Sequence, residues 1–263
     1  MNPVLYLVPV PIGDGVSAVE LAPRIVQVVS SLRDFVVENE KTARRFMASI
    51  VPQDVIDRAS FEVLDEHTRP ETLDSLLAPL RAGRSMAILS EAGSPCIADP
   101  GTNLVAAAAR NGFASVPLPG PSSILMALMA SGLGGQRFAF HGYLPPDQGG
   151  REAALRQLER RSAADGAAQL FIETPYRNDA IVTSAIRVLA SETMFCAATG
   201  LSSSAERILV QPIGWWKENP VHIGKIPTVF VMAAATGHYH EEPSPRRDSP
   251  AKGGKSPRHT GDK

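Results

Sequence analysis

The sequence predicts a two-domain α/β protein: a parallel-sheet domain comes first, an α+β domain with a mixed sheet comes second, and a ligand cleft lies between them. Three observations predict it. Short apolar runs alternate with helical patterns over about the first 117 residues, which is typical of βαβ units. Later strands follow one another with few helices between them. Loops rich in Gly, Pro and Ser end several strands, where ligands bind in open α/β sheets.

The first domain begins with an apolar strand at 4–8, which two prolines and a glycine in 9–14 bring to an end. A helix follows, and Ser17 is its predicted N-cap. The apolar face of this helix would contain Leu21, Ile25, Val28 or Val29, and Leu32. The other predicted strands of this domain are 35–37, 61–64, 86–89 and 114–118, and the other helices begin at 38 or cover 71–82 and 102–111.

The segment 117–121 (Pro-Leu-Pro-Gly-Pro) is the densest group of helix and strand breakers in the chain. It predicts the hinge between an N-terminal domain at 1–117 and a C-terminal domain at 118–237. The predicted helices of the second domain are 124–131, 151–162 and a segment from about 178 to 190, and its strands are 138–140, 169–172, 194–198, 207–212 and 228–235. The tail at 238–263 is almost free of apolar residues, which predicts disorder.

The composition is that of an ordinary globular protein, with 44% hydrophobic and 20% charged residues and a net charge of -1. No overall basic field attracts this chain to nucleic acid or to an anionic membrane. The N-terminus lacks the features of a signal peptide, and no apolar run approaches the ~20 residues of a membrane span. We therefore expect a soluble cytoplasmic protein without a membrane partner.

Several familiar catalytic motifs are absent from the sequence. It contains no P-loop, no G-x-G-x-x-G after the first strand, no H-E-x-x-H, no Cys/His cluster with zinc spacing and no G-x-S-x-G. We therefore expect no metal. What remains are the loops at strand ends, above all 89–101, which suit a small molecule held mainly by backbone groups in a cleft between domains. The alternative for such a loop is a tight turn whose glycines only satisfy backbone geometry.

Five loop segments occur in an order and spacing that point to one family. They are 8–13 (VPVPIG), 90–101 (SEAGSPCIADPG), 116–123 (VPLPGPSS), 137–145 (RFAFHGYLP) and 173–177 (ETPYR). Together they resemble the successive motifs of the tetrapyrrole (corrin/porphyrin) methylase superfamily. They are most similar to its ribosomal RNA small subunit methyltransferase I branch, whose members 2′-O-methylate ribose in 16S ribosomal RNA. The resemblance covers about residues 4 to 235.

The resemblance implies a homodimeric two-domain methyltransferase that binds S-adenosyl-L-methionine in the cleft between its domains. Carried onto this sequence, it implies cofactor contacts from Ile12, Gly13, Ala92, Gly93, Ser94, Ile97, Ser122, Ser123, Glu173, Thr174, Leu201, Ile226, Pro227 and Thr228. Ser122 and Ser123 would approach the methionine end, and Glu173 and Thr174 the adenosine. Local structure is the alternative for each of them; Ser122, for example, suits a helix N-cap.

The resemblance is weakest where the methyl acceptor would bind. The branch usually ends its second strand with Ala-Glu-Asp-Thr-Arg, whereas this chain has Val-Glu-Asn-Glu-Lys-Thr-Ala-Arg-Arg at 37–45. It also has Glu91 where the branch typically has aspartate. Glu38 is the candidate general base, and Lys41 or Arg44 would hold a phosphate. The alternative for this charged run is a solvated helix start.

Three functions therefore stay open. The first is 2′-O-methylation of a ribose in small-subunit ribosomal RNA, with that RNA or the small subunit as partner. The second is methylation of a small metabolite or tetrapyrrole. The third is a cofactor-binding protein that has lost catalysis. A helix face with Arg151, Arg156, Arg160 and Arg161 is either an RNA contact or a solvated surface.

Overall fold

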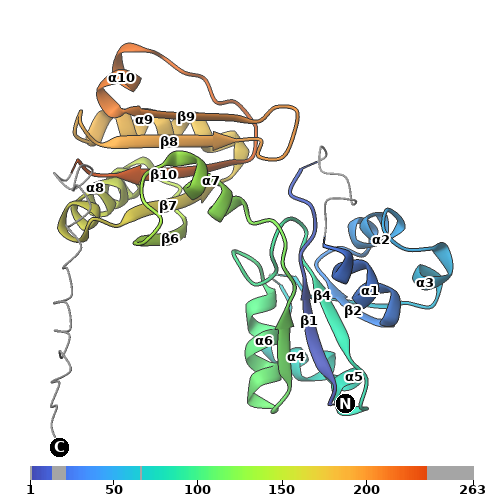
Figure 1. Cartoon of the computed structure of the whole chain (residues 1–263). Coiled ribbons are helices and arrows are strands. Elements are labelled where there is room, and N and C mark those ends of the chain that lie inside the picture. Colours follow the sequence, from blue (N-terminus) through green and yellow to red (C-terminus); the bar gives the residue numbers. More distant parts are fainter. Residues whose placement is uncertain (1, 14–21, 66, 236–263) are drawn as a thin grey trace, which may run out of the picture.

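The structure, a computed structural model, describes residues 2–13, 22–65 and 67–235 and contains two lobes, each built on a five-stranded sheet (Figure 1). The expectations for Ser17, Leu21 and the tail at 238–263 lie outside the described residues. The two lobes are consecutive in the sequence, and the segment between β5 (Ala114–Pro117) and α7 (Ser123–Ser131) connects them (Figure 1).

The first sheet is entirely parallel, as the alternation of strands and helices predicts. Its order is β3-β2-β4-β1-β5, and every neighbouring pair runs in the same direction. The strands are β1 (Val4–Val8), β2 (Asp34–Val37), β3 (Ser60–Val63), β4 (Met86–Leu89) and β5 (Ala114–Pro117). β4 is buried at all four positions, because strands cover both its edges and helices cover both its faces.

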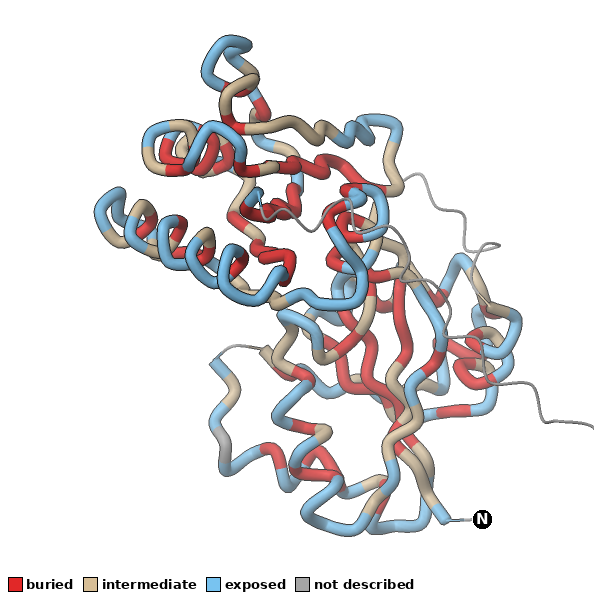
Figure 2. The backbone as a smooth tube through the Cα atoms, turned by 60° about the vertical axis from the view of Figure 1, so that its left-hand side comes forward, coloured by how far each residue is buried: buried red, intermediate tan, exposed pale blue. Residues whose placement is uncertain are grey.

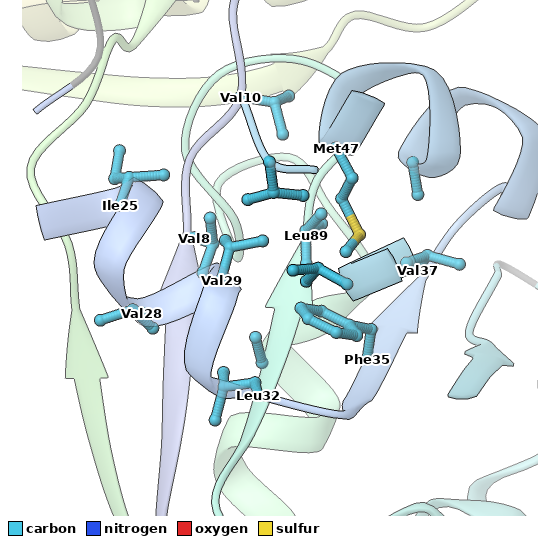
Figure 3. Close-up of a cluster of buried hydrophobic side chains, with 14 of the residues drawn as sticks. Val8, Val10, Ile25, Val28, Val29, Leu32, Phe35, Val37, Met47 and Leu89 are labelled. Carbon is cyan, nitrogen blue, oxygen red and sulfur yellow. The ribbon is translucent and has the colours of Figure 1, made fainter. Parts of the chain in front are cut away.

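Helices cover both faces of the first sheet. One layer contains α1 (Pro23–Ser31), α2 (Glu40–Ala48) and α3 (Gln53–Asp57), and the other contains α4 (Pro70–Leu76), α5 (Ala78–Arg81) and α6 (Gly101–Arg110). Figure 3 shows the core of the first layer, which includes Ile25 and Val29 of α1 and Phe35 and Leu89 of the sheet. The predicted helix at 71–82 is interrupted at Leu77, since Pro79 has no amide hydrogen to continue it.

The second sheet is mixed, as predicted, with the order β6-β7-β10-β8-β9. Only β6 and β7 are parallel neighbours; the other three pairs are antiparallel. The strands are β6 (Phe138–Tyr143), β7 (Ala168–Glu173), β8 (Met194–Thr199), β9 (Arg207–Pro212) and β10 (Thr228–Ala233). β6 runs three residues beyond its predicted end, past a register shift between Phe140 and Tyr143 where Gly142 has a φ of 65°.

Helices also cover both faces of the second sheet, and burial concentrates on its three central strands, β7, β10 and β8 (Figure 2). One face carries α7 (Ser123–Ser131). The other carries α8 (Gln148–Asp165), α9 (Asn178–Val188) and α10 (Ile213–Glu218), with the 3₁₀ turn η2 (Pro175–Arg177) before α9. Arg151 of α8 is buried and donates to Ser184 Oγ at 2.9 Å and to the Pro146 carbonyl at 3.0 Å. The RNA-contact interpretation is therefore wrong for Arg151, although Arg156, Arg160 and Arg161 are exposed.

The order of the first sheet places three loops together. The strands β1 and β4 are neighbours in this sheet. After β1 the chain continues to β2, on the far side of β4, and after β4 it continues to β5, on the far side of β1. A topological switch point therefore lies between β1 and β4. The loops after these two strands are joined directly: Val10 and Gly93 exchange backbone hydrogen bonds of 2.9 and 3.1 Å. Ser94 Oγ then donates to the Pro121 carbonyl at 2.9 Å, which ties the same loop to the segment that connects the lobes.

Candidate functional site

A cavity of about 570 Å³ lies between the two lobes; we call it the first cavity. It is mostly apolar with a few polar groups, as small-molecule sites are. The loops after β1 and β4 form one wall and the ends of β7, β8 and β10 form the other. Its lining is Ile12, Gly13, Ala92, Ser123, Tyr143, Ile172, Glu173, Thr174, Pro175, Ala198, Gly200, Leu201, Ser203, Ile226, Pro227, Thr228 and Val229.

Most of the residues that the sequence placed at the cofactor lie together around this cavity. Those that line it are Ile12, Gly13, Ala92, Ser123, Glu173, Thr174, Leu201, Ile226, Pro227 and Thr228. Gly93, Ser94, Ile97 and Ser122 are not among the lining residues. Gly93 and Ser94 hold the two loops together through the bonds described above. Ser122 is at the N-cap position of α7, but its side chain makes no capping hydrogen bond.

Gly13 sets the distance between the walls of the first cavity. A Cβ atom at this position would lie 2.7 Å from the carbonyl oxygen of Ser202 and 3.1 Å from that of Leu201. These oxygens belong to the backbone of the second lobe and cannot turn away as a side chain can. The close approach of the two lobes therefore requires glycine at position 13.

Glu173 lines this cavity, and one of its two carboxylate oxygens has no partner among the described residues. Its Oε1 accepts hydrogen bonds from the Thr174 amide at 2.6 Å and from Arg177 Nε at 2.9 Å. Its Oε2 is buried and has no partner among the described residues. Because a buried acceptor without a partner is costly, this oxygen fits a ligand that donates a hydrogen bond, such as an amino group or a hydroxyl.

Asn178, which the sequence did not single out, holds the loop that closes the cavity. It is fully buried, and its Nδ2 donates to the carbonyls of Gly224 at 2.9 Å and Ile226 at 2.7 Å and to Thr228 Oγ1 at 3.2 Å. Only the folded structure reveals this role, because the bonded residues lie 46 to 50 positions further along the chain.

A second cavity of about 810 Å³ adjoins the first, and Tyr143 lines both. It lies outside the ends of β2, β3 and β4 and is strongly polar, with four carboxylates in its wall. Its lining is Glu38, Asn39, Leu64, Asp65, His67, Thr68, Leu73, Glu91, Ala98, Asp99, Pro100, Asn103 and Tyr143. Tyr143 is 56% exposed and lies in the predicted motif at 137–145, but no pattern in the sequence distinguishes it from its neighbours.

Glu38 is the acid–base candidate in the second cavity. Burial, followed by a hydrogen bond and charge repulsion from Asp99, raises the pKa of Glu38 to about 7. A weak hydrogen bond of 3.4 Å from the Glu91 amide to Glu38 Oε1 acts in the opposite direction. Such a carboxyl group changes its protonation near neutral pH, which a general base requires.

The two predicted cations of this region do not line the second cavity. Arg44 Nε donates to Glu40 Oε1 at 2.7 Å, and its guanidinium lies 4.4 Å from the ring centroid of Phe61. Lys41 is exposed in the first turn of α2, where its amide donates to the capping side chain of Asn39 at 2.9 Å. The three predicted catalytic residues therefore do not share one cavity: Glu38 lines the second cavity, and Lys41 and Arg44 do not.

The comparisons with known proteins identify the family. The model of the tetrapyrrole (corrin/porphyrin) methylases matches residues 4–214. This chain belongs to that family. It is 32% identical over 219 residues to the ribosomal RNA small subunit methyltransferase I of Escherichia coli O157:H7, covering 82% of this chain and 72% of the relative. It is 30% identical over 220 residues to the protein of that name from Synechocystis, covering 82% and 75%.

Solved structures of the family share the fold. The methyltransferase CobJ aligns with a TM-score of 0.59 at 17% identity, covering 89% of this chain and 95% of that one. A conserved hypothetical protein from Aeropyrum pernix K1 aligns with a TM-score of 0.61 at 17% identity, covering 90% and 86%. These structures show that the fold is shared, and the family and the relatives show that the protein is a methyltransferase that uses S-adenosylmethionine.

The first cavity fits S-adenosylmethionine. Its volume of about 570 Å³ is within the range of small-molecule sites, and its apolar walls suit a flat purine ring. The unpaired Oε2 of Glu173 suits a hydroxyl or amino donor on the adenosine. Within the described residues, no group of three or more His, Cys, Asp or Glu side chains could hold a metal ion, and no helix is long and apolar enough to cross a membrane.

Replacing Asn178 with Ala should weaken S-adenosylmethionine binding about fivefold, because two loop carbonyls lose their partner and a net hydrogen bond contributes about 1 kcal/mol. Titration calorimetry measures the affinity. Asn219→Ala is the matched control, since the exposed Asn219 side chain bonds only the Trp215 carbonyl of its own helix. Equal affinities in both variants would contradict a role of Asn178 in shaping the pocket.

Proposed function

We propose that this protein 2′-O-methylates a ribose of small-subunit ribosomal RNA. The single observation that carries the proposal is the second cavity: it opens beside the S-adenosylmethionine cavity, and Glu38 stands in its wall. A ribose hydroxyl is a weak nucleophile and benefits from a base within reach. The relatives named above carry the name of a small-subunit ribosomal RNA methyltransferase, which supports the choice of substrate.

The residues of this chain have separable tasks in the proposed reaction. Bound S-adenosylmethionine supplies a methyl group on a positively charged sulfur. Ile12, Ala92 and Leu201 would enclose it between the lobes and exclude water. Glu173 would fix the adenosine, and Glu38 would accept the proton of the attacking hydroxyl. Alignment of the acceptor with the methyl group can by itself lower the activation free energy of such a displacement by ~7–11 kcal/mol.

Two measurements test the proposal. Titration calorimetry with S-adenosylmethionine should give a measurable heat, and its absence at high protein concentration would remove the cofactor assignment. Ribose methylation is then mapped on small-subunit RNA from cells with and without the gene. We expect one site to lose its methyl group, and unchanged methylation would remove the RNA assignment.

One observation favours a second candidate, methylation of a small metabolite. The second cavity presents the carboxylates of Glu38, Asp65, Glu91 and Asp99, which repel the phosphates of RNA. In the RNA proposal only a ribose and its base enter the cavity, and the phosphates stay outside it. Methyl transfer to a metabolite extract, combined with unchanged RNA methylation, would favour the second candidate.

We also infer that the protein acts as a cytoplasmic homodimer, with domains at 1–117 and 118–237 hinged at 117–121. An exposed apolar face supports the dimer: Leu125 and Met129 of α7 are 46% and 80% exposed, and Phe138 of β6 is 43% exposed. They border a hollow of about 420 Å³ next to the edge strand β6. Apolar faces of this kind mark interfaces between proteins.

Met129→Lys should shift the protein from dimer to monomer, since it places a charge in the proposed interface. Light scattering after size-exclusion chromatography measures the mass. Val63→Lys is the control, because Val63 is 48% exposed but lies in the other lobe. A dimer that survives Met129→Lys, or a monomeric wild-type protein, would contradict the proposed interface.

A further inference from the structure

Tyr143 of β6 is the residue at which the two cavities meet, since it lines both of them. It is 56% exposed, and its hydroxyl makes no hydrogen bond with any other described residue. Among the described residues that line the second cavity, it is the only phenylalanine, tyrosine or tryptophan. An exposed aromatic ring therefore lies at the border between the site of the methyl donor and the candidate site of the acceptor.

A one-residue bulge in β6 places this ring on the cavity side of the second sheet. Phe140 pairs with Leu170, whereas Tyr143 pairs with Ile172, so three steps along β6 match two steps along β7. Without the extra residue, Tyr143 would lie one position further along β7, and its side chain would point to the opposite face of the sheet. Gly142 accommodates the bulge with a φ of 65°, which residues with a side chain rarely adopt. Bulges that redirect a side chain recur beside active sites.

In this register Tyr143 extends a row of side chains that crosses the second sheet. Ile172 of β7 pairs with Val229 of β10, and Val229 pairs with Ala198 of β8. All four residues of the row line the first cavity. Tyr143 is at the end of the row, on the edge strand, and it is the member that also lines the second cavity. The bulge thus continues the cavity-facing row of the sheet as far as the acceptor cavity.

An aromatic ring is the kind of contact that RNA can use in the second cavity. The four carboxylates in its wall repel phosphates, whereas a nucleobase is uncharged and has a flat face that can lie on an aromatic ring. Unpaired bases of RNA are commonly bound by stacking on aromatic side chains. The first cavity needs the ring less, because aliphatic side chains from both lobes, among them Ile12 and Leu201, already line it. The ring therefore fits the acceptor better than the donor.

We propose that Tyr143 is the stacking platform for the base of the nucleotide whose ribose receives the methyl group. The inference rests on the proposed function, which supplies an RNA acceptor. A base stacked on Tyr143 would keep its ribose beside the first cavity, which holds the donor. The ring makes the contact and the hydroxyl has no partner among the described residues, so phenylalanine should replace Tyr143 without loss.

The test compares Tyr143→Leu, which removes the ring but keeps an apolar side chain, with Tyr143→Phe, which keeps the ring. Methyl transfer is measured at saturating S-adenosylmethionine with increasing concentrations of small ribosomal subunits from cells that lack the gene. Tyr143→Leu should raise the KM for the subunits about tenfold, within the range of effects that loss of a stacking ring causes. The kcat should change by less than about twofold, because the stack forms before the reaction and persists during it. Tyr143→Phe should keep both constants of the wild type.

Tyr176→Leu is the matched control. Tyr176 is 72% exposed but lines neither cavity, so its replacement should change neither constant. Melting temperatures report whether each variant folds, and Tyr143→Gln takes the place of Tyr143→Leu if the latter does not. Calorimetry separates the two cavities: the affinity of Tyr143→Leu for S-adenosylmethionine should stay within about twofold of the wild-type value.

A wild-type KM in a folded Tyr143→Leu protein overturns the inference. An equal loss in Tyr143→Leu and Tyr143→Phe also overturns it, because the hydroxyl would then be the active group. A loss of affinity for S-adenosylmethionine with an unchanged KM for the subunits assigns the ring to the donor and overturns it too. Failure of the proposed function is a separate result: the wild-type protein would then methylate no small subunits, whereas failure of the inference alone leaves wild-type methylation intact.

Discussion

Replacing Glu38 with Gln should lower kcat of methyl transfer by about 10²- to 10⁴-fold, the usual contribution of a general base. The carboxyl is half-buried in the second cavity, and burial and Asp99 raise its pKa to about 7. In the wild-type enzyme the rate should therefore rise with pH through about 7, because only ionised Glu38 accepts a proton. The amide cannot ionise, so this rise should be absent from the variant. Single-turnover rates across pH measure both effects.

Glu40→Gln is the matched control for this experiment. Glu40 is two residues away and exposed, and it pairs with Arg44 at 2.7 Å outside both cavities. Such surface pairs contribute only about 0.3–0.5 kcal/mol. Binding of S-adenosylmethionine should survive in both variants. If the Glu38 and Glu40 variants have equal rates, Glu38 is not the base. If no variant and no wild-type protein methylates any substrate, the cofactor-binding protein without catalysis is favoured instead.

Gly13→Val should weaken binding of S-adenosylmethionine by about tenfold to hundredfold, or about 1.4–2.8 kcal/mol. The Cβ atom of the new side chain would already lie 2.7 Å from the Ser202 carbonyl oxygen, and in valine this Cβ also carries two methyl groups. The loops on the two sides of the cavity would have to separate, and contacts with the ligand would be lost on both walls. Calorimetry measures the affinity, and the melting temperature in the absence of ligand reports on the fold.

The control for this substitution is Gly149→Ala. Gly149 is an exposed position of α8, and a Cβ there would meet nothing closer than Asp147 Oδ1 at 3.6 Å. Its affinity for S-adenosylmethionine should equal that of the wild type. A Gly13→Val protein that melts like the wild type and binds as tightly would show that the lobes do not need this close approach.

Family membership could be predicted from the sequence because its signals are local. Glycine and proline have particular backbone conformations, so they gather in turns at strand ends, as in the segment 90–101. Such a segment can be recognised in the sequence without knowledge of the fold. The alternation of strands and helices predicted the parallel sheet, and the later succession of strands predicted the mixed one. The five loop segments supplied eight of the 17 residues that line the first cavity.

Side-chain partnerships across the fold could not be predicted in this way. Lys41 and Arg44 share a charged run with Glu38, yet neither lines the second cavity. Asp99 and Asn178 look like ordinary turn and helix residues in the sequence.

The sequence by itself predicted the two sheets and many of the residues that line the first cavity, because periodicity and turn chemistry are properties of neighbouring residues, and the family followed from the resemblance of five loop segments to known motifs. Only the tertiary structure placed Glu38 and Asp99 in the wall of one cavity and bonded Asn178 to the loop at 224–228. The physical reason is the strand order: β2 lies beside β4, although the helices α2 to α5 and the strand β3 separate the two in the chain, and no local pattern encodes that neighbour.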